Sequence, residues 1–542
     1  MEIKDLEIPS LNQFASDYSQ GNLEAEDYFH YSLSDPDLFQ KRYSDLMTRS
    51  FMRAELADYI YGYMAKFTLS DKVLTNIKDL QKEDSVVVIG GQQAGLLSGP
   101  LYTIHKVISI IKLAKQQEKA LNKKVIPVFW IAGEDHDLAE VNHVYALKGE
   151  KPEKVAFPLY HPFKTMVSDL ALDPESAVKW IEEIMETYGE TDFTQELLDK
   201  SKSFLRKGGS FVDFFASLIN DWFAEYGLLL LDAADPKLRK IESGYFLKLI
   251  DQAGPITEAV LEQQAFMREK GYKRIIEMES DAANIFYCDP EKNERILLQQ
   301  SASNFKGKDG IPAFSKSELL AIADRSPERL SNNVVTRPIM QEMLFPVLAF
   351  ISGPGEIAYW AELKRAFELF DIKMPPIIPR LNISILERGI ATDIEETGVG
   401  LIEVLTAGTA EAEKRYLEEV KDDTVESLFA QTRANLEENH LKFSSKAGEF
   451  DKGLQPLLEK NRKILLGQLD FAHSRFIKST RERHSIVLEK YNRIETSLHP
   501  LGSPQERIWT VFYYLNKYGP DFIADLMQLD YEFNNKHKVI YI

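Results

Sequence analysis

Short runs of consecutive apolar residues interrupt this sequence and are separated by longer amphipathic segments. The clearest run covers residues 86–89, where four β-branched residues follow one another without polar alternation, as in a strand covered on both faces. Similar runs follow at 125–132, 228–231, 346–351 and 377–378, and polar or glycine residues follow each of them. The pattern predicts an α/β fold around a parallel sheet of five strands, whose carboxyl ends should share one candidate site.

Amphipathic segments around the first run predict helices. Residues 1 to about 80 carry apolar residues at near-helical spacing, and we expect this region to be helical. After the first run, Pro100 stands where the first turn of a helix tolerates proline, and residues 104–113 form an apolar stripe. Together with the run at 125–132, this helix completes a β-α-β unit with an expected right-handed crossover.

The region from about 380 to 500 is rich in Glu, Lys, Arg and Leu, which is typical of long helices. Its apolar seams run through Leu417, Val420, Leu428 and Leu436, and through Leu458, Leu465, Leu469 and Phe476. Two glycines within 444–453 mark a turn, so the seams predict an antiparallel coiled coil. We expect the α/β core with helical insertions over 1–390, the coiled-coil hairpin over 391–497, and a segment returning to the core over 498–542.

Composition limits the classes of function. The net charge is −19, which opposes binding to nucleic acid or to an acidic membrane surface, since both need clustered basic residues. The single cysteine, Cys288, excludes an intrachain disulfide and a multi-thiolate zinc site. No secretion signal and no apolar run of about 18 residues is recognisable. We therefore expect a cytoplasmic protein.

A glycine-rich loop follows the first predicted strand and leads into a helix, a geometry that brings backbone N–H groups to a phosphate or carboxylate. It is not a Walker A loop, because Leu96 and Leu97 replace the required Lys and Ser or Thr, and it lacks the G-x-G-x-x-G spacing. A tight turn with solvated glutamines is the alternative. The candidate residues here are Gln92, Gln93, Gly95, Ser98, Gly99, Tyr102, Thr103, His105 and Lys106.

A dense group of ionisable residues follows the second predicted strand. Its ionisable members are Glu134, Asp135, His136, Asp137, Glu140 and His143, and Asn142 lies among them. If a helix begins here, His136, Glu140 and His143 share one face, a spacing that suits a divalent metal or an acid/base pair. The alternative is an acidic N-cap on that helix.

A third group surrounds the fourth predicted strand. It contains Arg337, Gln341, Gly353, Glu356, Tyr359 and Trp360. The glycine turn and the aromatic pair could enclose a ligand. Alternatively, the two aromatic residues pack a helix onto the sheet, which is the commoner use of such side chains.

These groups, taken together, resemble the family of bacillithiol-synthesis cysteine-adding enzymes, BshC. The similar blocks are residues 91–95, 99–106, 127–132, 134–137, 141–145, 333–338, 353–360, 379–380 and 504–507. The resemblance implies a Rossmann-like core akin to class I aminoacyl-tRNA synthetases and nucleotidylyl transferases, and a coiled coil through which the protein forms a homodimer. It also implies a ligase that joins the carboxyl of cysteine to the amine of glucosaminyl-malate.

In this scheme the cysteine carboxyl is activated, as an adenylate or a phosphate, before the amine attacks. His136 or Glu134 would take the proton from the amine, while Lys106, Arg337 or Arg380 would hold malate or phosphate oxygens. Asp135, Asn142 and His143 would join the substrate site. Arg380, Ser384 and Arg507 would hold nucleotide phosphates where the C-terminal segment meets the base of the coiled coil, with an ion pair of Arg507 as the alternative. The sequence leaves open ATP, another nucleotide or a divalent metal as cofactor.

Two other classes of function compete with this hypothesis. One is a non-catalytic dimeric scaffold in which the coiled coil carries the function, and it predicts that residues at the strand ends can be replaced freely. The other is a metal-dependent hydrolase or transferase built on residues 134–143, and it predicts a tightly held metal.

Overall fold

The computed structural model describes residues 1–10, 12–149, 151–206, 208–301 and 304–542. The chain forms two compact units. The first combines residues 1–385 with 505–542, and the second contains residues 386–504. Within the described ranges, no helix combines the length and the apolar character that crossing a membrane requires.

A parallel five-stranded sheet lies at the centre of the first unit. Its strands are β2 (Val86–Gln92), β3 (Val125–Ile131), β6 (Leu229–Asp232), β12 (Val347–Ser352) and β13 (Ile377–Pro379). They pair in the order β13-β12-β2-β3-β6, all in parallel. Nearly all of their residues are buried, which explains the uninterrupted apolar runs. The α/β prediction and its five strands are confirmed.

Helices connect and cover these strands. Helix α5 (Tyr102–Leu121) follows β2 and packs against β2 and β3. The N-terminal helices are α1 (Gln13–Gln20), α2 (Leu38–Leu46), α3 (Arg53–Met64) and α4 (Asp71–Leu80). Between β3 and β6 lie β4 (His143–Lys148), β5 (Lys151–Ala156), α7 (Pro174–Tyr188), α8 (Thr194–Leu205) and α9 (Phe211–Phe223). Between β6 and β12 lie α10 (Pro236–Asp251), α11 (Ala253–Glu269), α12 (Lys316–Arg325) and α13 (Thr336–Leu344), with a further sheet.

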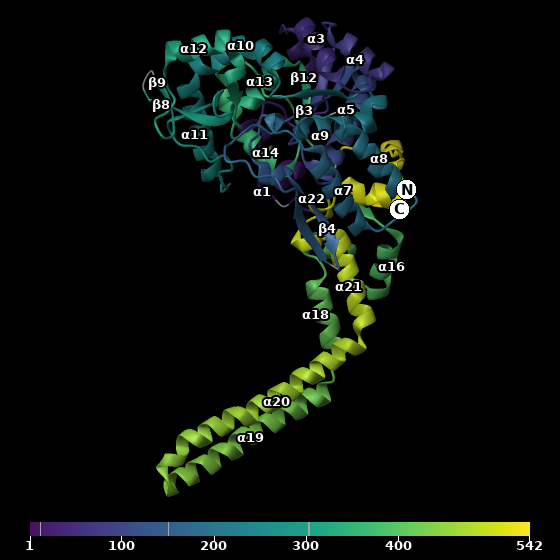
Figure 1. Ribbon diagram of the computed structural model, residues 1–542, viewed down its shortest axis with the longest axis vertical. Coiled ribbons are helices and arrows are strands. Elements are labelled where there is room, and N and C mark those ends of the chain that lie inside the picture. Colours follow the sequence, from purple (N-terminus) through teal and green to yellow (C-terminus); the bar gives the residue numbers. More distant parts are fainter. Residues whose placement is uncertain (11, 150, 207, 302–303) are drawn as a thin grey trace. The chain divides into compact units, whose positions relative to one another are not determined.

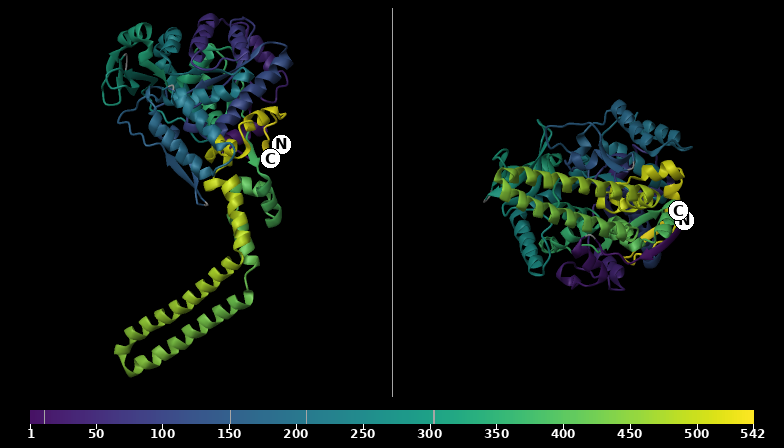
Figure 2. Two further views of the ribbon diagram at one scale, coloured as in Figure 1. Left: turned by 45° about the vertical axis from the view of Figure 1, so that its right-hand side comes forward. Right: turned by 90° about the horizontal axis from the view of Figure 1, so that it is seen from below.

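The prediction that residues 1–80 are entirely helical is wrong at the N-terminus. Strand β1 (Glu2–Leu6) pairs antiparallel with β15 (His537–Tyr541), and β14 (Ile383–Leu386) completes this small sheet. The strand forms because its partner comes from the far end of the chain, a long-range pairing that local periodicity does not reveal. Figures 1 and 2 show the two chain ends side by side.

An antiparallel sheet that the apolar runs did not reveal forms beside the parallel one. It contains β7 (Ala282–Asp289), β8 (Glu294–Ser301), β9 (Asn304–Gly307), β10 (Ala313–Ser315) and β11 (Leu330–Asn332). The strand order is β10-β9-β8-β7-β11. Figure 1 shows α10, α11 and α12 gathered around this sheet. Strands β8 and β11 matter for function, because they deliver polar residues to the site described below.

The second unit contains the predicted helical hairpin. Helices α19 (Asp423–Phe450) and α20 (Gln455–Arg483) run side by side (Figures 1 and 2), and residues 451–454 form the turn. Their pairing is antiparallel, since Glu426 near the start of α19 contacts His473 near the end of α20 at 2.9 Å. Further along, Glu437 pairs with Arg462 at 2.7 Å. The helices α16 (Arg388–Thr397), α17 (Leu401–Ala407), α18 (Ala410–Glu419) and α21 (Ser485–Leu498) complete this unit.

The C-terminal segment belongs to the first unit. It contains α22 (Gln505–Ile508), α23 (Val511–Tyr518) and α24 (Phe522–Gln528), followed by β15. The carbonyl of Trp509 accepts a hydrogen bond from the N–H of Leu101, and the Thr510 hydroxyl donates to the carbonyl of Leu97. These bonds tie the end of the chain to the loop that follows β2.

Candidate functional site

The strand order of the parallel sheet reverses between β2 and β12. Strand β2 comes first in the chain, with β3 and β6 on one side of it and β12 and β13 on the other. In doubly wound sheets ligands bind outside the carboxyl ends of the strands at this switch point. The loop after β2 and the helix after β12, α14 (Pro354–Ala361), begin there. The topology therefore directs attention to these two segments.

Close packing explains the glycines that follow β2. A Cβ on Gly91 would lie 2.8 Å from a backbone carbonyl of β3, and a Cβ on Gly95 would lie 2.8 Å from the Cα of Gly99. Leu97 and Ser98 adopt φ values of 50° and 68°, which cost a non-glycine residue about 1 kcal/mol or more. The Ser98 hydroxyl is buried and has no hydrogen-bond partner in the described residues. The loop is therefore tightly constrained, unlike a solvated turn.

Lys106, on α5, joins the two segments at the switch point. Its ammonium donates to the carbonyl of Gly91 at 2.8 Å, to Oε1 of Gln92 at 3.1 Å and to Oε2 of Glu356 at 2.5 Å. The same Glu356 oxygen accepts the N–H of Gly353 at 2.7 Å and so caps α14. Burial lowers the pKa of Lys106, while the Glu356 carboxylate opposes that change. All three ammonium protons have protein acceptors, so Lys106 holds β2 and α14 together.

Arg337, on α13, lies beside this pair. Its guanidinium donates to the hydroxyl of Tyr359, and no carboxylate of the described residues lies within ion-pair distance of it. Burial raises the pKa of Tyr359 to about 12, although the charge of Arg337 opposes this. One turn further along α13, Gln341 is buried, and neither polar atom of its amide has a partner in the described part of the chain. Arg337 therefore keeps donors for an anionic ligand.

Trp360 lies apart from this polar group. Its ring centroid is 4.5 Å from that of Phe350, on β12, and 5.8 Å from that of Phe367. The side chain is only 1% exposed. Trp360 thus packs α14 onto the sheet, as the alternative to enclosing a ligand had predicted. Tyr359, in contrast, contacts Arg337.

Glu134, directly after β3, takes part in a buried ion-pair network. One of its carboxylate oxygens accepts from the guanidinium of Arg239, on α10, and from the backbone N–H of Asn332 at 3.2 Å. Arg239 also pairs with Glu242 at 2.5 Å. Burial raises the pKa of Glu242 to about 7 against the attraction of Arg239. Glu134 is only 3% exposed, so its position suits a structural support better than a proton acceptor.

His136 lies against an arginine that the sequence motifs did not include. Nη1 of Arg295, on β8, is 3.1 Å from Nδ1 of His136. The same guanidinium donates to Ser331 Oγ at 2.7 Å and to the carbonyl of Asn332, and it lies 3.8 Å from the ring centroid of Phe286. Burial and the positive charge of Arg295 lower the pKa of His136. The contact with Arg295 fixes the orientation of the ring, and the lowered pKa favours its neutral form.

Gln93 connects the glycine loop with the ionisable group after β3. Its amide donates to Oδ2 of Asp135 at 2.6 Å and to the carboxylate of Glu140. Burial alone would raise the pKa of Asp135, but the Gln93 hydrogen bond and the charge of Arg295 outweigh it and lower this pKa. The contact places the loop and the ionisable group at the same edge of the sheet.

The expected helix with His136, Glu140 and His143 on one face does not form. Helix α6 covers only Leu138–Val141, and His143 already begins β4, where it pairs with Ala156 of β5. This antiparallel hairpin ends the helix after one turn. Asp137 caps α6 through the N–H of Ala139 at 3.2 Å, so the N-cap alternative holds for that residue.

Asn142 and His143 lie at the start of the β4-β5 hairpin. The carbonyl of Asn142 accepts the N–H of Phe157 at 2.6 Å. Burial lowers the pKa of His143, and its Nδ1 is buried without a recorded partner. Across the residues whose placement is described, no group of three or more His, Cys, Asp and Glu side chains is arranged to hold a metal ion.

Arg380, which follows β13, is committed to a carboxylate. It forms a two-pronged ion pair with Glu506, on α22, at 2.7 and 2.5 Å. Nδ1 of His105 lies 2.9 Å from the same carboxylate. Burial would raise the pKa of Glu506, but the charge of Arg380 and the His105 contact depress it well below its ordinary range. Arg380 therefore ties α22 to the parallel sheet.

Tyr102, at the start of α5, lies between two arginines. The guanidinium carbons of Arg380 and Arg507 are 5.9 and 5.8 Å from its ring centroid. Arg507 is exposed, and no ion pair of this residue is recorded within the described ranges. Ser384 follows Arg380 by four residues. The hydroxyl of Ser384 lies 2.9 Å from Nε2 of His537. The alternative to phosphate binding was an ion pair between Arg507 and a carboxylate. In the described residues, it is Arg380 that forms such an ion pair, with Glu506.

The sequence motifs missed Arg239, Arg295 and Asn332, all of which contact the ionisable group after β3. For Arg295 a signal was present. Residues 282–289 and 294–301 each contain a short run of apolar residues, and they flank Pro290 and Asn293, which is typical of a β-hairpin. Nothing local identifies Arg239, because it lies on an ordinary amphipathic helix.

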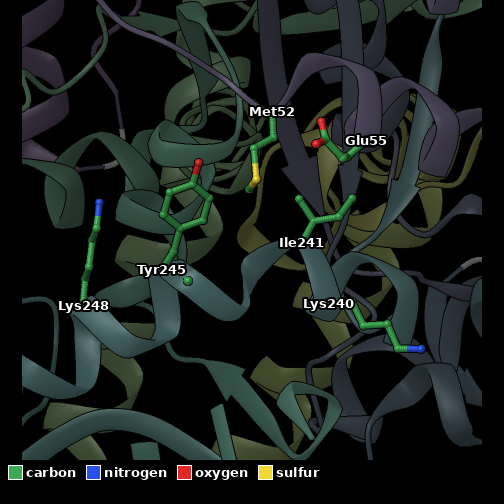
Figure 3. A pocket seen from close by; sticks show the side chains of 7 residues that line it. Met52, Glu55, Lys240, Ile241, Tyr245 and Lys248 are labelled. Carbon is green, nitrogen blue, oxygen red and sulfur yellow. The ribbon is translucent and has the colours of Figure 1, made fainter. Parts of the chain in front are cut away.

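A separate cavity of about 460 Å³ lies between α3 and α10. Its lining residues are Met52, Glu55, Lys240, Ile241, Gly244, Tyr245 and Lys248. Figure 3 shows Lys240 and Lys248 at opposite ends of this cavity. It therefore lacks the few convergent polar groups that characterise a ligand site, and it contains none of the residues described above.

Comparisons with known proteins agree with this architecture. Residues 1–381 match the family model described as "Bacillithiol biosynthesis BshC, N-terminal Rossmann-like domain", and residues 383–542 match "Bacillithiol biosynthesis BshC, C-terminal coiled-coil domain". A protein of Geobacillus sp. (strain WCH70) is 46% identical, and proteins of Geobacillus kaustophilus and Bacillus licheniformis are each 43% identical. Each alignment covers 100% of both chains, and all three relatives carry the name "Putative cysteine ligase BshC". The chain belongs to the BshC family of bacillithiol biosynthesis.

Proposed function

We propose that this chain is a ligase that forms an amide bond between the carboxyl group of cysteine and the amine of glucosaminyl-malate. Family membership and the shared name of the full-length relatives support this activity. The observation that carries the substrate assignment is that Arg337 has hydrogen-bond donors left for a ligand. This arginine is partly buried at the switch point, and Tyr359 is its one hydrogen-bond partner among the described residues. Its remaining forked donors suit a carboxylate such as those of malate.

The chemistry requires an activated acyl group, because amide formation from a free carboxylate is uphill in water. ATP would supply it as cysteinyl-adenylate or cysteinyl-phosphate. The amine nitrogen then attacks the carbonyl carbon, AMP or phosphate leaves with the bonding electron pair, and the nitrogen loses one proton. Backbone N–H groups of residues 91–99 would stabilise the developing negative charge. The ammonium protons of Lys106 are already donated to protein acceptors. Lys106 therefore contributes by fixing the positions of the Gly91 carbonyl and the Glu356 carboxylate.

The experiment that tests this function supplies the purified full chain with cysteine, ATP and glucosaminyl-malate and follows the thiol product by mass. We expect Arg337→Ala to raise KM for glucosaminyl-malate by about 10- to 100-fold, the usual effect of losing a charge-assisted hydrogen bond. Turnover of a methyl glucosaminide, which lacks malate, should be unchanged in that variant. Arg325→Ala, at an exposed arginine of α12, is the control. Absence of the product with the unmodified chain would refute the ligase activity.

A second candidate site, for nucleotide phosphates, is proposed at Arg507 with Arg380 and Ser384. The two guanidinium groups flank Tyr102, and Arg507 is exposed. Arg380 already donates to the carboxylate of Glu506, so it has fewer donors left for a phosphate. Arg507 is therefore the member whose donors are available to a phosphate.

We also propose that the protein is a cytoplasmic homodimer whose subunits meet through the coiled coil. Leu428, on α19, is 55% exposed and Leu465, on α20, is 38% exposed, although both belong to the apolar seams. Leu458, by contrast, is buried within the hairpin. Exposed apolar residues along a two-helix hairpin are best covered by a second copy of the same hairpin.

A further inference from the structure

The contact between the guanidinium of Arg295 and Nδ1 of His136 limits the chemistry of the His136 ring. An arginine side chain carries only hydrogen-bond donors and stays protonated in proteins. Its Nη1 lies 3.1 Å from Nδ1 of His136, so Nδ1 must be the acceptor in this contact. The guanidinium cannot turn away easily, because it is 6% exposed, bonds to Ser331 and Asn332, and lies over Phe286.

The tautomer of His136 follows from this contact. A neutral imidazole carries one proton, and if Nδ1 accepts from Arg295, the proton must be on Nε2. Nε2 then has no free electron pair and cannot take a proton from an amine. Within the described residues, no protein acceptor is recorded for Nε2. The Nε2–H of His136 is therefore available as a hydrogen-bond donor, and the ring cannot act there as the general base that the sequence suggested.

We infer that His136 is a neutral hydrogen-bond donor through Nε2 toward an oxygen of the acyl substrate, and that Arg295 is the positioning residue that fixes this tautomer. The inference rests on the proposed ligase function for the identity of the substrate. A neutral donor fits acyl transfer, since the carbonyl oxygen of the activated cysteine gains negative charge as the amine attacks. The proton released by the amine then passes to solvent water and not to His136.

The charges around the ring favour the same state. Arg295 from β8 and Lys164, from the segment after β5, oppose protonation of His136, while Asp135 and Asp137 favour it. Asp135 is already engaged by Gln93 and by the N–H groups of His136 and Asp137. In the described residues, these hydrogen bonds occupy the Asp135 carboxylate, and it makes none to the His136 ring.

The direct test is the protonation pattern of the ring in the full chain, observed by long-range ¹H–¹⁵N correlation with ¹⁵N-labelled histidine. His136 is one of ten histidines, and the spectrum of His136→Gln identifies its signals by difference. We expect a proton on Nε2 and none on Nδ1 near pH 7. In Arg295→Met the preference for this tautomer should weaken and the pKa of His136 should rise, whereas Arg295→Lys should keep the preference. A proton on Nδ1 in the unmodified chain would overturn the inference, whether or not the variants fold.

An activity test separates a donor from a base. The amide N–H of a glutamine can replace an Nε2–H donor, but no amide can replace a base. We expect His136→Gln to retain kcat within about tenfold, and His136→Leu to lose about 100- to 1000-fold, the usual cost of removing a donor to an oxyanion. Equal losses in both variants, with unchanged melting temperatures, would contradict the donor role. If the unmodified chain makes no thiol product, the ligase function fails, while the ring spectrum still decides the tautomer.

Discussion

The ammonium of Lys106 lies 2.5 Å from a carboxylate oxygen of Glu356. Lys106 belongs to the helix that follows β2 and Glu356 to the helix that follows β12, so the contact spans the point at which the strand order reverses. The side chain of Lys106 is 2% exposed and that of Glu356 is 21% exposed. Such a pair is sensitive to the loss of one partner, because a buried charge is then left without compensation.

Lys106→Met should therefore destabilise the first unit by about 3 kcal/mol. Calorimetric melting of the full chain measures the effect, with Lys240→Met, at an exposed position of α10, as the control. Adding Glu356→Gln to Lys106→Met should restore part of the loss, since the uncompensated carboxylate is removed. Strictly additive losses would show that the two residues are not coupled.

Asp232, at the end of β6, predicts a pH-dependent stability. Burial raises its pKa from 3.8 to about 7, so the folded chain keeps a proton that the unfolded chain loses between these values. Its contribution to stability is complete below about pH 4 and is lost as the pH rises to 7. In Asp232→Asn the amide can donate to Ser168 and still accept from the N–H of Ala234.

The variant Asp232→Asn should consequently gain stability over the parent as the pH rises from 4 to 7, by at most about 1.4 kcal/mol per pH unit. Above pH 7 the difference should stay constant. Thermal midpoints of both proteins at pH 5, 6, 7 and 8 check this expectation. A difference that does not vary with pH would mean that Asp232 is ionised in the folded chain throughout this range.

Gln92→Ala should abolish bacillithiol production in cells that lack their own enzyme and leave the melting temperature nearly unchanged. The Gln92 side chain accepts from Lys106 at 3.1 Å, and this partly exposed residue at the end of β2 contributes little to core burial. Gln81→Ala, at an exposed position after α4, should leave production unchanged. Loss of stability together with production would favour a structural role for Gln92.

Arg507→Ala should weaken binding of ADP, because its guanidinium is the available donor beside Tyr102. Titration calorimetry with ADP measures the affinity, and Arg325→Ala is again the control. We expect a loss of about tenfold, typical of one charge-assisted hydrogen bond. Unchanged affinity would refute the proposed nucleotide site without affecting the proposed ligase activity.

If the proposed homodimer forms through the coiled coil, Leu428→Glu combined with Leu465→Glu should give a monomer, since both side chains are exposed on the hairpin and a charge there opposes burial against a partner. Sedimentation measures the mass. Lys442→Glu, at an exposed position of α19, should leave the dimer intact. Deleting residues of about 405–490 and joining the ends with a short linker should likewise give a monomer. A dimer that survives the deletion would exclude the coiled coil as the interface.

The parallel sheet and the hairpin were predictable because their signals are local. A buried strand such as residues 86–89 is uniformly apolar, and the seams of the hairpin repeat along a single helix. Strand β1 could not be recognised in this way, since its stability depends on β15 at the other end of the chain. The helix expected after Glu134 ends after one turn for a different reason, because residues 143–148 pair with the following residues 151–156 in the β4-β5 hairpin.

The candidate site was predictable in part. Topology alone placed the loop after β2 near the residues after β3, and the contact of Gln93 with Asp135 agrees with it. The state of each side chain was not predictable, because it depends on partners from distant segments. The sequence does not reveal that Arg295 lies beside His136, or that Arg380, which was predicted to hold substrate or phosphate oxygens, pairs with Glu506.

The pairing of β1 with β15 has a consequence for biosynthesis. Glu2 lies opposite Tyr541, so β1 cannot form this pair until residues near 540 have been translated. At about 5–20 residues per second, this interval lasts on the order of half a minute or longer. The β2-β3 pair could form early, whereas the small sheet closes only after the hairpin of residues 423–483 has been translated. Deleting β15 should therefore leave the facing edges of β1 and β14 unpaired, which invites aggregation of newly made protein.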